Sequence, residues 1–115
     1  MTPISATDAI LDLAVDDYTG LWEVVAAMRK IYPERNDLDL KDTAVIAIKQ
    51  LLKEGFIGVY RGNNFSGEET KLKAAEAFAA LSDERNWAWG APKLHDHIRL
   101  AATGEGERAY YGRQP

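Results

Sequence analysis

The sequence predicts an α+β fold that is mostly helical, and three observations lead to this expectation. Apolar residues recur every three or four positions in four separate stretches, which is the spacing of amphipathic helices. Two short stretches, at 56–60 and 97–101, are β-prone or alternate between polar and apolar residues. The 115 residues are 46% hydrophobic and 28% charged, which is typical of a folded protein, and the length favours a single domain over residues 1–115.

Two helices are expected before residue 33. The first begins after Ser5 or Thr7, since either hydroxyl can cap it, and its apolar stripe lies opposite a row of aspartates. The second spans residues 21–30 and ends before Pro33, because the residue that precedes a proline is disfavoured in a helix.

A third helix and a strand follow a polar turn. The helix is expected from about Leu40 to Glu54, with Asp39 as its N-cap and Gly55 as the glycine that ends it. Its core side is expected to consist of Ala44, Val45, Ile48, Leu51 and Leu52. The strand at 56–60 comes directly after the glycine.

About 35 residues separate the two predicted strands, and they hold a helical insertion over about 63–92. Within it, a capping box at Ser66-Gly67-Glu68-Glu69 predicts a helix through about Leu81, and a loop rich in tryptophan follows. After the second strand, Thr103 is expected to cap a last helical turn over 105–111.

Two segments carry a resemblance to a known fold family. Residues 42–60 read as a helix with small and apolar residues on one side, then Leu-Leu-x-x-Gly, then an aromatic-aliphatic strand. Residues 98–110 read as a strand, then a Thr-x-x-Gly step into a helix. Both segments resemble parts of a winged-helix (winged helix-turn-helix) domain. The resemblance as a whole spans about residues 7–111 of the chain. The resemblance implies a three-helix core with a two-strand wing, although a wing normally has a short loop where this chain has its insertion.

The opening segment carries a second resemblance. Residues 17–23, Asp-Tyr-Thr-Gly-Leu-Trp-Glu, resemble the start of small uncharacterised bacterial proteins with this layout. That resemblance assigns no activity and no site residues.

Acidic residues are concentrated near the start of the chain. The net charge is −4, and residues 1–37 alone hold seven acidic and three basic residues. Helical spacing places Asp8, Asp12 and Asp16 on one stripe, where like charges four residues apart destabilise a helix by about 0.2–0.5 kcal/mol per pair. A stripe that costs stability favours docking to a basic protein, and the alternative is a solvated face that aids solubility.

Trp87 and Trp89 form a second candidate surface in the loop before Pro92. Exposed tryptophans are effective interface anchors. Alternatively, the two indoles fold back over the sheet, where their N–H groups find carbonyl partners. The candidate partner-binding residues are therefore Asp8, Asp12, Asp16, Asp17, Trp87 and Trp89.

The winged-helix resemblance also implies DNA binding as an alternative, because the third helix of that family enters the major groove. The residues available for this role are Lys41, Lys49, Gln50, Lys53, Arg61 and Arg99. Asp39 and Asp42 would stand at the groove entrance and oppose phosphates, and no block of the sequence is strongly basic. Nucleic acid is therefore possible but disfavoured.

The sequence offers little catalytic or metal-binding chemistry. It lacks cysteine, so disulfides and thiolate zinc sites are excluded, and it has no nucleophile elbow, phosphate-binding glycine loop or zinc-protease helix. His95 and His97 share one face if they lie on a strand, but no third ligand follows at a recognisable spacing, and polar strand-edge residues are the alternative. We expect no enzyme activity, no cofactor and no metal.

Together these patterns predict a non-enzymatic module that binds a protein. The small size and acidity suggest an immunity- or antitoxin-type protein with a basic partner, and a winged-helix transcriptional regulator is the alternative. Without a visible secretory signal or an apolar run of about 18 residues, we expect a cytoplasmic protein that has no membrane contact. It is expected to be a monomer or a weak homodimer.

Overall fold

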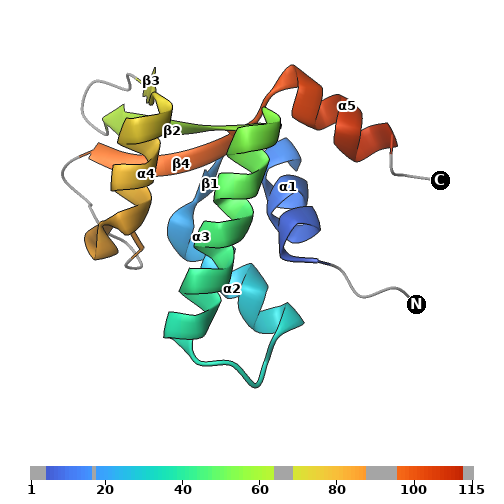
Figure 1. Cartoon of the computed structure of the whole chain (residues 1–115), viewed down its shortest axis with the longest axis vertical. Coiled ribbons are helices and arrows are strands. Elements are labelled where there is room, and N and C mark those ends of the chain that lie inside the picture. Colours follow the sequence, from blue (N-terminus) through green and yellow to red (C-terminus); the bar gives the residue numbers. More distant parts are fainter. Residues whose placement is uncertain (1–4, 17, 64–68, 88–95, 113–115) are drawn as a thin grey trace.

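Helices and a small antiparallel sheet share one apolar core in the computed structural model, which describes residues 5–16, 18–63, 69–87 and 96–112 (Figure 1). The helices are α1 (Ala6–Asp16), α2 (Leu21–Ile31), α3 (Asp37–Glu54), α4 (Ala74–Ser82) and α5 (Gly104–Gly112), with a short 3₁₀ helix, η1 (Glu84–Trp87). The strands are β1 (Thr19–Gly20), β2 (Ile57–Asn63), β3 (Glu69–Lys71) and β4 (Asp96–Ala102). The predicted α+β class is thus confirmed.

The sheet has the order β1-β4-β2-β3, and all neighbouring strands are antiparallel. Register places Val59 opposite Leu100, with Thr19 on the other side of Leu100. These residues are buried, as are Ile57 and Ile98, because alternate residues of a strand point to one face. That face packs against the helices and forms the core.

The first two helices begin and end close to their predicted residues. Ser5 caps α1, since its Oγ accepts a hydrogen bond from the Asp8 amide at 3.1 Å. α2 ends at Ile31, one residue later than expected and still before Pro33. Both helices turn an apolar stripe to the core, made up of Ala6, Ile10, Leu11 and Ala14 from α1 and Leu21, Val24, Val25 and Met28 from α2.

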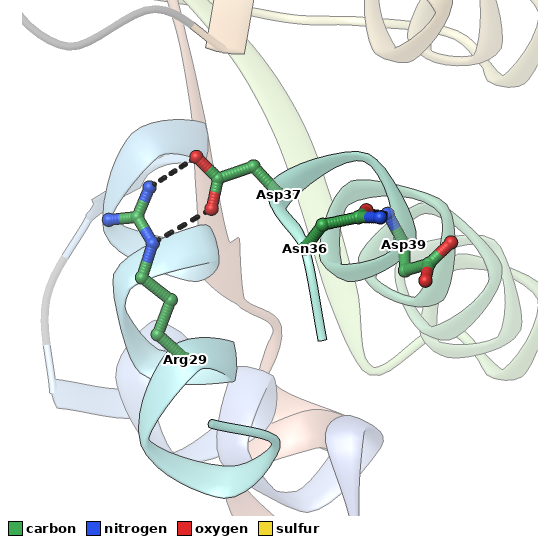
Figure 2. Close-up of polar contacts among 4 residues, drawn as sticks. All are labelled: Arg29, Asn36, Asp37 and Asp39. Carbon is green, nitrogen blue, oxygen red and sulfur yellow. Dashed lines mark hydrogen bonds and ion pairs between the residues drawn. The ribbon is translucent and has the colours of Figure 1, made fainter. Parts of the chain in front are cut away.

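The start of α3 differs from the prediction. Asn36, not Asp39, is the N-cap, and its side-chain oxygen accepts a hydrogen bond from the Asp39 amide at 2.9 Å (Figure 2). The first turn therefore begins at Asp37, three residues before the expected start. The end is as predicted, because Gly55 adopts the left-handed conformation with φ of 77°.

The insertion between β2 and β4 is not the single long helix expected from residue 66. Glu69 lies in β3, opposite Gly62 of β2, so the predicted capping box that ends at Glu69 is wrong. α4 begins only after Lys73, whose amide donates to the Glu76 carboxylate at 3.1 Å. In Figure 1, α4 lies beside α3.

The C-terminal helix α5 is joined to the turn between α3 and β2. Thr103 caps α5 as predicted, because its hydroxyl oxygen accepts a hydrogen bond from the Gly106 amide at 3.0 Å. The same hydroxyl donates to the Gly55 carbonyl at 2.6 Å, and the Thr103 amide donates to the Phe56 carbonyl at 3.0 Å. These contacts direct α5 toward α1, against which it packs (Figure 1).

Candidate partner-binding groove

A groove of about 700 Å³ lies between α1 and α2 and is bordered by α5. Its apolar lining residues are Ala9, Leu13, Ala26, Ala27 and Ile31. They flank the buried stripes of their helices, so they are half-buried. Three of the five are alanines, and their short side chains leave the space between the two helices open.

The charged lining residues are predominantly acidic. Asp8, Asp12 and Glu23 line the groove together with Lys30, which leaves a surplus of two negative charges. Carboxylates beside an exposed apolar surface favour a ligand that is both apolar and cationic. This combination distinguishes the groove from a plain solvated acidic face.

Tyr110 of α5 forms the remaining part of the groove lining. Its hydroxyl donates a hydrogen bond to Asp12 of α1, which lies 98 residues earlier in the chain. The hydrogen bond raises the pKa of the Tyr110 phenol, since the neutral phenol is the donor, and the negative charge of Asp16 acts in the same direction. No local pattern in the sequence pointed to Tyr110 as a member of this site.

The predicted acidic stripe is divided by the structure. Asp8 and Asp12 line the groove, whereas Asp16 is exposed at the end of α1 and acts on Tyr110 only through its charge. Asp17 lies outside the described residues. The half of the stripe nearer the start of α1 is therefore the part that belongs to the groove.

The predicted tryptophan surface is not found at Trp87. The side chain of Trp87 is only 8% exposed, and its Nε1–H donates to the Leu81 carbonyl at 2.9 Å. The burial and the carbonyl partner agree with the packed alternative, although the main contacts of η1 are with α2 and α4 and not with the sheet. We therefore do not count Trp87 among the residues available to a partner. Trp89 lies outside the described residues.

Four of the six residues of the DNA-binding alternative contact neighbouring side chains. The Lys41 ammonium lies 5.8 Å from the ring centroid of Trp87, and that of Lys49 lies 5.2 Å from the ring centroid of Phe78. Two further hydrogen-bonded or ionic contacts join Gln50 to Glu54 at 2.8 Å and Arg99 to Glu69 at 3.7 Å.

The remaining basic residues do not complete one surface. Arg61 lies opposite Ile98 and Arg99 lies opposite Tyr60, so the two arginines occupy opposite faces of the sheet. Lys53 is exposed in the last turn of α3. The structure therefore does not gather the six candidate residues.

The face of the sheet turned away from the core is a second exposed surface. Register aligns Gly20, Arg99, Tyr60 and Lys71 in one row across the four strands. The Tyr60 ring meets the Tyr18 ring edge to face at 5.7 Å. Because the ion pair with Glu69 offsets the charge of Arg99, this surface lacks the surplus of negative charge that the groove has.

Within the part of the chain that the structure describes, no three His, Asp or Glu side chains are grouped to hold a metal ion. Nor is any described helix long and apolar enough to cross a membrane. Comparisons of the chain with protein-family models, curated proteins and solved structures give no match. The groove is therefore the candidate functional site of this protein.

Proposed function

We propose that this protein is a non-enzymatic module that binds a basic protein partner through the groove between α1 and α2. The observation that carries the proposal is the convergence of Asp8, Asp12 and Glu23 on an open, largely apolar groove. Protein interfaces combine an apolar centre with a polar rim, and complementary charge speeds and orients encounter.

The scaffold that we propose is winged-helix-like. The order of elements supports it, since α1, α2 and α3 precede two long antiparallel strands, β2 and β4, and β1 pairs with the outer side of β4. On this view β3, α4 and η1 are the insertion that replaces a short wing loop. A scaffold of this kind does not by itself imply DNA binding, because one fold supports many functions.

The partner class within this proposal is a basic, nuclease-like toxin, and the protein acts as an immunity protein or antitoxin in the cytoplasm. A small acidic protein with a net charge of −4 suits such a role, because it masks the cationic surface that a nuclease uses to bind phosphates. It acts as a monomer or weak homodimer, which leaves the groove accessible.

The test compares two double variants in affinity capture from lysates of the cells that produce the protein. Asp8→Lys with Asp12→Lys reverses two charges in the groove. Glu34→Lys with Glu84→Lys makes the same net change at exposed residues elsewhere. We expect the groove variant to bind the captured basic partner about tenfold more weakly or worse, and the control variant to bind it like the wild type.

Two outcomes would reject the proposal. One is that no basic protein is retained by the wild-type chain above background. The other is that both double variants weaken binding equally, which would show that net charge and not the groove is recognised. Thermal melts monitored by circular dichroism establish that each variant is folded before binding is compared.

A further inference from the structure

We infer that the element received by the groove is an amphipathic α-helix of the partner, with a stripe of small apolar residues flanked by Lys or Arg. This inference rests on the proposed function and deepens it, since it states which structural element the groove recognises. Shape, continuity with an existing contact, and charge support it independently.

The shape of the groove suits a helix. The walls of the groove run from Asp8 to Leu13 on α1 and from Glu23 to Ile31 on α2, which is about 8 Å and about 12 Å of helix and matches about two turns of a third helix. Ala9 of α1 and Ala26 and Ala27 of α2 are part of these walls, and such small residues permit the interaxial distances of about 8–10 Å at which helices pack.

An extended peptide is a poorer occupant for a physical reason. Apart from the end turns, the backbone N–H and C=O groups of α1 and α2 are used within those helices, so the groove offers an extended chain no ladder of hydrogen-bond partners. A helix brings its own backbone hydrogen bonds and needs only side-chain contacts. The groove therefore favours a helix over a strand.

One helix of the protein, α5, already packs beside this groove. α5 packs against α1, and Tyr110 both lines the groove and donates a hydrogen bond to Asp12. This contact combines an apolar ring with a polar group that meets a carboxylate. A partner helix that docks alongside would extend the same type of contact over the open part of the groove.

The positions of the charges define the expected pattern on the partner. Asp8 and Asp12 are four residues apart on α1, so they lie one turn from each other and match basic residues at i and i+4 of a neighbouring helix. Glu23 lies on α2, so it favours a basic residue on the opposite side of the partner helix's apolar stripe. Lys30, also on α2, favours an acidic residue where it contacts the partner.

The probes for this inference are two capped peptides of identical composition, about 18 residues of Ala, Leu, Lys and Arg. In the first, Ala and Leu follow helical spacing and form one stripe. In the second, the same residues are rearranged so that no stripe exists. We expect the striped peptide to bind at least about tenfold more tightly in titration calorimetry, with NMR shift changes at Leu13, Ala26 and Tyr110.

Matched variants separate this inference from the proposed function. Ala26→Leu narrows the groove and should weaken binding of the striped peptide about fivefold or more, whereas Ala75→Leu on the exposed side of α4 should not. Equal binding of the two peptides, or no effect of Ala26→Leu, would overturn the helix inference and leave the charge-based function standing. Binding that is unchanged in the Asp8→Lys, Asp12→Lys variant would overturn both.

Discussion

Gly106 marks the closest approach between α5 and the rest of the fold. A Cβ at this position would lie 1.9 Å from the carbonyl oxygen of Phe56, a distance that real Cβ atoms essentially never show. The obstacle is backbone, which cannot rotate away as a side chain can. The position therefore needs glycine because of this contact.

We predict that Gly106→Ala lowers the free energy of unfolding by about 1–3 kcal/mol, since α5 must shift away from the turn at Gly55 and Phe56. Gly112→Ala is the control in the same helix, because a Cβ there meets nothing within 4 Å. Urea denaturation of the two variants measures the difference. Equal stability of the two would show that α5 is not held at Gly106.

Arg29 and Asp37 form a bidentate ion pair between α2 and the first turn of α3 (Figure 2). The guanidinium Nε and Nη2 donate to the two carboxylate oxygens at 3.0 and 2.9 Å. The hydrogen bonds from Arg29, together with its charge, lower the pKa of Asp37, and the pKa of Arg29 is raised in turn. Both side chains are exposed, so the pair adds little to overall stability.

We predict that the Asp37 carboxyl titrates below the ordinary aspartate pKa of about 3.9, and that Arg29→Gln returns it toward that value. Because the folded-state pKa is lowered, the contribution of this pair is present above the unfolded-state pKa and is lost as the pH falls through the folded-state pKa. NMR titration of the carboxyl carbon measures both midpoints. An unchanged midpoint in Arg29→Gln would contradict this assignment.

Two substitutions on α3 test which face of this helix packs in the core. Leu51 is 1% exposed, so Leu51→Ala is predicted to cost about 2–5 kcal/mol of unfolding free energy. Ile46→Ala is the matched control, because Ile46 is a large aliphatic residue on the same helix and is 71% exposed. Denaturant melts compare the two, and a loss below about 1 kcal/mol for Leu51→Ala would place the core on another face of α3.

The helices could be predicted from the sequence because each carries its own apolar repeat, but the starts of α3 and α4 could not. For α4 the reason is that Glu69 pairs with β2, so the helix begins only after Lys73. Asn36 and Asp39 are both good caps, and only the three-dimensional path of the chain selects Asn36. β1 and β3 could not be predicted from local pattern, because they are two and three residues long and exist through pairing with strands elsewhere in the chain.

The candidate site shows the same division between local and long-range information. Helical spacing was enough to place Asp8 and Asp12 on one side of a helix. The groove is also lined by Ala26 and Ala27 of α2 and by Tyr110 of α5. Two alanines in a helical sequence do not by themselves indicate a groove, and Tyr110 is distant in the sequence. Because several helices line the groove, the amphipathic pattern of one helix indicates only the residues that this helix contributes.

The distribution of charge over the protein predicts weak binding to DNA. The net charge is −4, and Arg61 and Arg99 lie on opposite faces of the sheet, so few cations converge on one stretch of phosphates. We expect mixed-sequence duplex DNA to bind with a Kd weaker than about 10 μM at ~150 mM salt, measured by fluorescence anisotropy. Nanomolar binding that falls steeply with salt would instead favour the regulator alternative.

The two edges of the sheet bear on how the protein behaves at high concentration. β1 is two residues long, and β3 consists of Glu69, Thr70 and Lys71, all exposed. The seven-residue strands β2 and β4 occupy the centre and pair with each other along their whole length, whereas β1 pairs with two residues of β4 and β3 with three residues of β2. Short, charged edges are poor templates for adding a further strand. Growth of fibrils by addition of strands at these two edges is thereby disfavoured in the native state.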